Sequence, residues 1–239
     1  MTKVDAIEKV MLSNGGAASL GLIYNEIEKY YPSAKQSKDW EAGIRGVLYR
    51  EIQKGKRFKK IGISIYALID YAEENVPEEK IRMHSYIEGI CVELGNFKKY
   101  ETYTADPSAV YRDNLCLNNF ATIKDLPPFS YPQILDDVKN IDVLWFNKNG
   151  YQFPQRAFEV VDSIDTLNGA FNRCTQLQYI NTKFYIVAPD KHYEKFNKTL
   201  DMEIYKNIKH RFTFINYDDI INLYEGTVKA NKIESRIFG

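Results

Sequence analysis

Two short apolar runs joined by a turn restrict the fold of this chain most strongly. Residues 141–146 (IDVLWF) and 156–161 (RAFEVV) have the length and the branched and aromatic content of buried strands. Asn149-Gly150 between them is a strong signal for a hairpin. Helical and strand-like segments then alternate at 166–179, 183–188, 191–208, 211–215 and 218–230. The pattern predicts an α+β domain.

Two further segments precede these runs. A helix is predicted over residues 77–94, with Gly95-Asn96 as its stop, and a strand over 99–104. The order of elements is then αβββα followed by βαβα. Residues 106–139, which hold four prolines, are expected to form a long irregular insertion, and loops of that length are usually functional or mobile.

The first 72 residues predict a smaller module of three helices and a hairpin. Helices are expected over residues 4–13, from Ser19 to about Tyr30, and from residues 37–39 through Ile52, with a β-wing over 58–67 that bends at Gly62. This is the winged helix-turn-helix plan, in which the third helix enters the DNA major groove. The acidic segment 73–79 predicts a linker, which gives a winged-helix domain at 1–72 and a second domain at 80–239.

The charge is divided between the two predicted domains. The chain has 32 basic and 32 acidic residues in total, but residues 1–72 hold 12 basic and 8 acidic ones, and the run KGKRFKK suits a phosphate backbone. The candidate DNA-binding residues are Lys38, Arg45, Arg50, Lys54, Lys56, Arg57, Lys59 and Lys60. A solvated turn would have a similar composition. The acids Asp39, Glu41 and Glu51 keep open a winged helix used for protein contacts or dimerisation.

Composition excludes several classes of protein. With 44% hydrophobic and 27% charged residues the chain should fold, and no apolar run approaches the roughly 18 residues of a membrane span. Because the start lacks a signal-peptide pattern, a cytoplasmic location is expected. Three scattered cysteines argue against a disulfide framework or a structural zinc site. No glycine-rich phosphate loop occurs, so no organic cofactor is expected.

Asp142 and Glu159 are acids within otherwise apolar strands. Burying an unpaired carboxylate costs several kcal/mol, so each acid needs a partner. Neighbouring antiparallel strands could bring both to one end of the sheet, within reach of a hard cation such as Mg²⁺, which suits phosphodiester hydrolysis. The alternative is a pair of strand-edge acids, one facing solvent and the other paired with Arg156 or Lys183.

An acid on the second strand and a glutamate on the third resemble the PD-(D/E)xK nuclease superfamily, to which many restriction endonucleases belong. The chain also resembles a group of prokaryotic restriction-endonuclease-like proteins over residues 82–217. The N-terminal module is similar to the winged helices, including the HARE-HTH type, that are fused to restriction enzymes. The segments that carry the likeness are 93–95, 141–145, 157–160, 168–169 and 184–189.

One position departs from the superfamily motif. Val161 stands two residues after Glu159, where the superfamily usually has lysine and some members have glutamate. Asp162 is adjacent, but it should face the opposite side of a regular strand unless a bulge turns it. Glu88, one helical turn from His84, could approach the metal from the first helix. The catalytic candidates are therefore Asp142, Glu159, Asp162 and Glu88, of which Asp142 and Glu159 are the expected metal ligands.

The resemblance implies a Mg²⁺-dependent, sequence-specific DNA endonuclease of the type II restriction class. Cutting both strands of a duplex needs two active sites or two visits, so a homodimer is expected. The alternative is a DNA-binding protein whose nuclease-like domain is inactive and serves as a dimerisation scaffold, which Val161 favours. A winged helix used only for protein contact is a third hypothesis.

Overall fold

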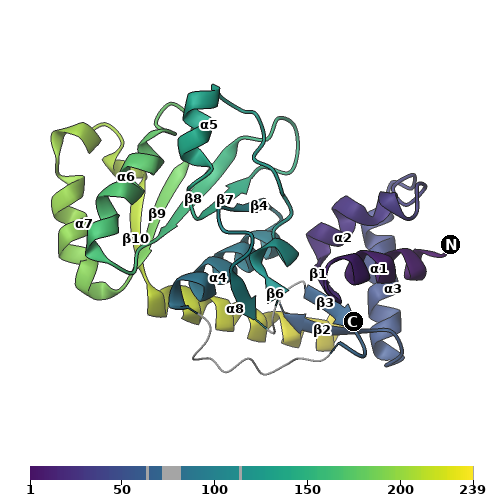
Figure 1. Ribbon diagram of the computed structural model, residues 1–239. Helices are drawn as coiled ribbons and strands as arrows, with labels where there is room; N and C mark the ends of the chain where they lie inside the picture. Colours follow the sequence, from purple (N-terminus) through teal and green to yellow (C-terminus); the bar gives the residue numbers. More distant parts are fainter. Residues whose placement is uncertain (63–64, 72–81, 113–114, 239) are drawn as a thin grey trace.

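The computed structural model describes residues 1–62, 65–71, 82–112 and 115–238. The predicted linker at 73–79 lies outside these residues. The helices and strands, shown in Figure 1, are α1 (Lys3–Ser13), β1 (Ala17–Ser19), α2 (Leu20–Glu26), α3 (Trp40–Gln53), β2 (Phe58–Gly62), β3 (Ile65–Leu68), α4 (Met83–Phe97), β4 (Glu101–Thr104), β5 (Val110–Arg112), β6 (Leu115–Cys116), α5 (Pro132–Val138), β7 (Val143–Phe146), β8 (Pro154–Val160), α6 (Leu167–Thr175), β9 (Lys183–Ala188), α7 (Tyr193–Leu200), β10 (Phe212–Asn216) and α8 (Tyr217–Phe238).

The N-terminal elements form three helices beside a three-stranded antiparallel sheet of order β1-β3-β2. Ser19 caps α2, since its side chain accepts a hydrogen bond from the Leu22 backbone at 3.1 Å, as the sequence predicted. Gly15 and Gly16 have φ values of 75° and 96°, a region that favours glycine, and turn the chain from α1 into β1. Strand β1 was not predicted, because three residues are too few to show a strand pattern.

The larger sheet has the order β10-β9-β8-β7-β4. Strand β7 pairs antiparallel with both β4 and β8, which confirms the predicted hairpin, whereas β8, β9 and β10 run parallel to one another. The parallel half contains the crossover helices α6 and α7, as parallel strands require. The sheet is therefore mixed.

Helices cover both faces of this sheet (Figure 1). Val143 and Trp145 of β7 point to the face that α4 and α8 cover, whereas Leu144 and Phe146 point to the face of α5, α6 and α7. This alternation is the two-residue period of a strand buried on both sides. The sheet therefore separates two apolar cores, and an acid on either face is surrounded by the apolar side chains of that face.

The N-terminal elements pack against the rest of the protein. Ala17, Ile65 and Ala67 of the small sheet belong to the same core cluster as α4 and α8. Helix α8 runs from the end of β10 along the molecule to the small sheet, so that one helix contacts both halves (Figure 1).

Three sequence predictions were wrong in detail. Helix α4 passes through Gly95-Asn96 to Phe97, because Gly95 allows a close contact: a Cβ there would lie 2.6 Å from Trp145 Nε1. Helices α6 and α7 are shorter than the segments 166–179 and 191–208, since turns and 3-10 helix complete both. Residues 106–139 were expected to be irregular but contain β5, β6 and α5. No helix in the described ranges is both long and apolar enough to cross a membrane.

Candidate metal centre

Asp142 lies where the start of β7 meets the end of β8. It immediately precedes β7, and because the two strands are antiparallel, it stands beside Val160, the last residue of β8. The Val160 backbone N–H donates to Asp142 Oδ2 at 2.7 Å. The N-terminal turns of α4 bring His84 and Glu88 to the same place, one helical turn apart.

His84, Glu88 and Asp142 form a compact cluster. The Nε2 atom of His84 lies 3.7 Å from Glu88 Oε1 and 3.7 Å from Asp142 Oδ1. One donor atom from each residue fits within 4.8 Å of the others. Two carboxylates and an imidazole at this spacing are a donor set for a divalent cation.

The buried carboxyl of Glu88 has room for a ligand. Glu88 is 1% exposed, and its Oε2 atom has no hydrogen-bond partner among the described residues. Burial and the charge of Asp142 raise the pKa of Glu88 to about 8. The hydrogen bond to Asp142 raises the pKa of His84 to about 9, although burial opposes this shift. Protons thus neutralise the acids where a metal ion would also do so.

Asp162 also reaches this cluster, although it was expected to face away. Strand β8 ends at Val160, so Asp162 is free of the strand alternation, and no bulge is needed. Its Oδ2 atom lies 3.6 Å from Nδ1 of His84, on the opposite side of the ring from Glu88 and Asp142. The Tyr217 hydroxyl at the start of α8 donates to Asp162 Oδ1. Neither contact was visible in the sequence.

Glu159 faces the other side of the sheet and is fully buried. Arg173 of α6 binds it in a bidentate manner, with Nε to Oε1 at 2.7 Å and Nη2 to Oε2 at 2.5 Å. Burial and the charge of Asp142 raise the pKa of Glu159 to about 8, while the hydrogen bonds from Arg173 act against this shift. The partner is thus Arg173 and not Arg156 or Lys183, a correction that required knowing which face α6 covers.

The missing motif lysine leaves an apolar position. Val161 is 1% exposed and packs in the core on the same face as Glu159. The positive charge on this face comes from Arg173 instead, whose side chain remains about one third exposed (32%). No sequence pattern pairs this arginine with Glu159, because the contact joins a strand to a helix 14 residues later.

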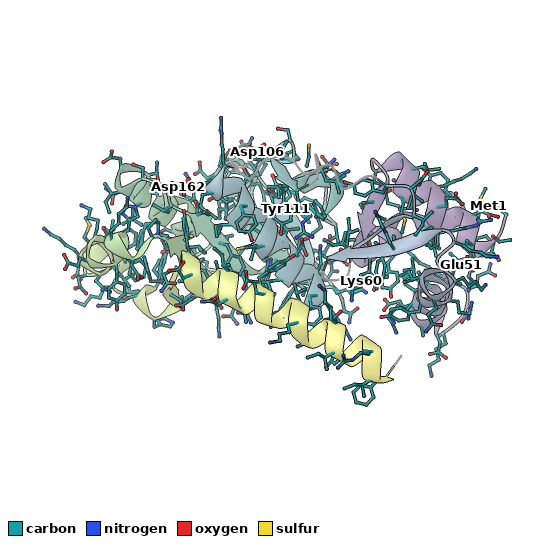
Figure 2. All side chains as sticks on the ribbon, turned by 90° about the horizontal axis from the view of Figure 1, so that it is seen from below. Met1, Glu51, Lys60, Asp106, Tyr111 and Asp162 are labelled. Atoms are coloured by element: carbon teal, nitrogen blue, oxygen red, sulfur yellow. The ribbon has the colours of Figure 1, made fainter. Side chains whose placement is uncertain are left out.

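The predicted DNA-binding cations differ in their surroundings. Lys38, Arg50, Lys54, Lys56 and Arg57 are exposed. Four of the eight are bound within the N-terminal elements: Lys54 to Glu51, Arg57 to Asp5 and Glu8, Lys59 to the Tyr71 carbonyl, and Arg45 to Glu41. Arg45 donates to the Tyr24 hydroxyl, and Lys60 donates to Asn231 of α8. Lys60 thus points to the C-terminal elements (Figure 2).

Comparison with known protein families gives a match over most of the chain. The family model of the type II restriction enzyme NmeDI C-terminal domain matches residues 68–237. The chain therefore belongs to this family of restriction enzyme domains. Comparison with curated proteins and with solved structures gives no match.

Proposed function

We propose that the protein is a metal-dependent DNA endonuclease of the type II restriction class, and that His84, Glu88 and Asp142 hold the metal ion. The observation that carries this proposal is their convergence within 4.8 Å at one end of the sheet, in a chain of a restriction enzyme family. The buried, unpartnered oxygen of Glu88 supports it, since such an atom is costly without a ligand.

Each residue has a distinct task in this scheme. The bound cation would polarise a phosphoryl oxygen and lower the pKa of the attacking water. The Val160 N–H holds one oxygen of Asp142, which leaves the other directed at His84. Asp162 faces the second ring nitrogen of His84 and orients the ring, as carboxylates beside metal-bound histidines commonly do. Tyr217 in turn fixes Asp162.

The donor set also bears on which metal is used. Mg²⁺, the cofactor expected from the sequence, prefers oxygen ligands, whereas an imidazole suits transition metals. With His84 in the centre, we propose that Mn²⁺ binds more tightly than Mg²⁺. Both ions would support hydrolysis, because both can polarise a phosphoryl oxygen.

Glu159 was predicted as a metal ligand, but that role would require its side chain to change its contacts. Its carboxylate would have to leave the guanidinium of Arg173, which holds both of its oxygens. We propose instead that the Glu159–Arg173 pair fixes the end of β8, and with it the Val160 amide that holds Asp142. Glu159→Gln distinguishes the two roles: loss of metal affinity indicates a ligand, and preserved affinity with lower stability indicates a support.

The N-terminal elements supply DNA affinity in this proposal. Three helices beside a small antiparallel sheet fit the winged-helix module predicted for residues 1–72. Lys38, Arg50 and Lys56 would contact phosphates, since they are exposed and form no ion pair within the described ranges. The module would place the DNA, while the domain at 80–239 cuts it.

A homodimer remains part of the proposal, because a duplex has two strands to cut. Helix α8 supports it with an exposed seam at heptad spacing, formed by Leu223, Gly226, Ala230, Ile233 and Ile237. Light scattering of the protein and of Ile233→Glu would give dimer and monomer masses, respectively. A monomer in both cases would contradict this part.

The second candidate function is a DNA-binding protein with an inactive nuclease-like domain. Val161 at the lysine position and the pairing of Glu159 with Arg173 favour it. In that case Asp142 and Glu88 would have no catalytic task, and DNA binding would not depend on metal.

The experiment is DNA cleavage by the purified protein with Mg²⁺, Mn²⁺ or EDTA, on methylated and unmethylated DNA. Discrete metal-dependent fragments that vanish with Asp142→Asn and Glu88→Gln would support the endonuclease. Asp136→Asn is the control, because that acid is 70% exposed and pairs only locally with Lys139. DNA binding without cleavage in every condition would favour the inactive scaffold.

A further inference from the structure

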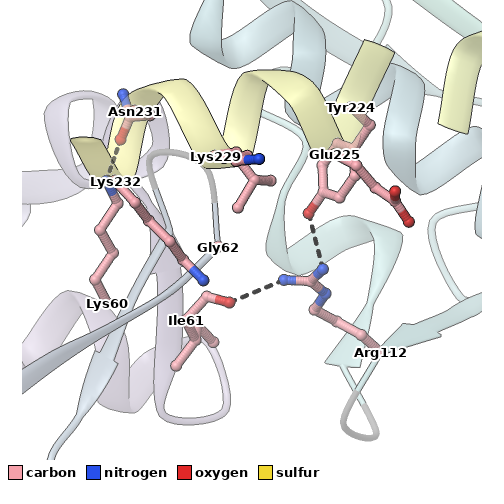
Figure 3. Close-up of a pocket in the computed structure, with 10 residues that line it drawn as sticks. Lys60, Ile61, Gly62, Arg112, Tyr224, Glu225, Lys229, Asn231 and Lys232 are labelled. Carbon is pink, nitrogen blue, oxygen red and sulfur yellow. Dashed lines mark hydrogen bonds between the residues drawn. The ribbon is translucent and has the colours of Figure 1, made fainter. Parts of the chain in front are cut away.

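A pocket of about 730 Å³ lies where the small sheet meets α8. Lys60, Ile61 and Gly62 of β2 form one wall, Arg112 of β5 another, and α8 the third (Figure 3). The volume is within the roughly 300–1,000 Å³ of small-molecule sites. The pocket is separate from the metal centre, to which none of these residues belongs.

Arg112 joins the three walls. Its guanidinium donates to the Ile61 carbonyl at 3.1 Å and to the Tyr224 hydroxyl at 2.8 Å, as Figure 3 shows. Nη1 also lies 3.5 Å from the buried carboxylate of Glu93. The charge of Arg112 is thus balanced within the fold, and this residue acts as a structural link.

The positive charges of three lysines in the pocket are not paired with an acid among the described residues. Lys60, Lys229 and Lys232 line it together with one acid, Glu225. The described part of the chain gives no ion pair to Lys229 or Lys232, and Lys60 donates to the neutral amide oxygen of Asn231. Burial and the charge of Lys232 lower the pKa of Lys60, so the two ammonium groups repel each other. An anion in the pocket would remove that repulsion.

We propose that this pocket binds a backbone phosphate of the DNA substrate. The inference rests on the proposed function. It extends the proposed DNA-binding surface from the predicted wing to helix α8. Helix α8 begins at Tyr217, which contacts the metal centre through Asp162. It lines the pocket from Tyr224 to Lys232 and contacts Lys60 at Asn231. Fourteen residues of helix span about 21 Å, roughly six base-pair steps of a duplex. Figure 2 shows Asp162 and Lys60 at well-separated places along this helix.

The test is the double variant Lys229→Ala/Lys232→Ala. Both side chains are exposed on the helix surface, so folding should be unaffected, which thermal unfolding verifies. The matched control is Lys195→Ala/Lys198→Ala on α7, which also removes two exposed lysines three residues apart. Binding to a labelled duplex is measured in EDTA over a range of salt concentrations, which separates this readout from metal-dependent cleavage.

The double variant should bind DNA several-fold to about tenfold more weakly. The slope of the logarithm of its binding constant against the logarithm of the salt concentration should be less steep by about one. The control should match the wild type. Equal affinity and slope for the double variant and the control would overturn the inference while leaving the proposed function intact. Thermal stabilisation of the wild type by inorganic phosphate or ATP, with DNA affinity unchanged in the variant, would reassign the pocket to a free anion. Absence of DNA binding by the wild type would refute the proposed function itself.

Discussion

The buried pair of Glu159 and Arg173 allows a quantitative prediction. Glu159 is fully buried and Arg173 holds both of its oxygens, so Arg173→Met leaves a carboxyl in an apolar core without its partner. Removing one partner of a buried pair costs about 3–5 kcal/mol. The Arg173 side chain is 32% exposed, so solvent weakens the pair, and the raised pKa of Glu159 lets its carboxyl take up a proton at pH 7 once its partner is gone. We therefore expect a smaller loss, about 2–3 kcal/mol.

Urea denaturation at pH 7 measures this loss of unfolding free energy, and the dependence of that free energy on urea concentration should be unchanged. Glu159→Gln should cost less, about 1–2 kcal/mol, because the guanidinium of Arg173 can be hydrated at the surface. The double variant Arg173→Met/Glu159→Gln should lose clearly less free energy of unfolding than the sum of the two single losses. The reason is that the first change has already broken the pair that the second change would break. Lys183→Met is the control and should remain within about 0.5 kcal/mol. Strict additivity, or a loss below about 1 kcal/mol for Arg173→Met, would refute the reasoning.

Three further predictions follow from the structure. The pKa of Glu88 is raised from 4.5 in the unfolded chain to about 8, so its favourable contribution is present below pH 4.5 and lost as the pH rises to 8. Glu88→Gln should therefore stabilise the metal-free protein at pH 8 by roughly 2–4 kcal/mol but have little effect at pH 4.5; an equal effect at both would contradict the assignment. Gly89→Ala should destabilise by about 2 kcal/mol or more, because the new Cβ would lie 2.1 Å from the Tyr111 ring. Gly226→Ala in α8 should be neutral or stabilising within one chain, since no atom among the described residues, apart from the adjoining residues of α8, lies within 4 Å of the new Cβ. Mn²⁺ at 100 times its Kd should stabilise the wild type by about 2.7 kcal/mol in thermal or urea unfolding, and no stabilisation would argue against a metal site.

Local patterns in the sequence predicted most elements of the fold. The hairpin of β7 and β8 follows from two apolar runs around Asn149-Gly150, and the cap of α2 follows from Ser19. Errors arose where packing overrides propensity. Gly95-Asn96 has the composition of a helix stop, but Gly95 instead allows Trp145 to approach the helix closely, which only the three-dimensional arrangement reveals.

The candidate site could be predicted only in part, because contacts between distant elements are not visible in local sequence patterns. Asp142 stands out in the sequence as an acid within an apolar strand, whereas Asp162 and Glu88 were candidates because they lie near the superfamily motif and on the first helix; the structure brings all three together around His84. Glu159 was singled out correctly as a buried acid, but its face of the sheet and its partner depend on where α6 packs. Spacing along the chain carries no information on contacts between distant elements, which is also why the pocket beside α8 was not foreseen.

The most direct test of the central claim is the binding of a metal ion to the purified protein. Titration calorimetry with Mn²⁺ should give one ion per chain, with affinity reduced at least tenfold in Asp142→Asn and in His84→Ala, and unchanged in Asp136→Asn. Release of protons on binding should accompany it, because Glu88 and His84 hold protons near neutral pH in the free protein. Equal affinity in all four proteins, or no binding at all, would contradict the assignment of the metal centre to His84, Glu88 and Asp142.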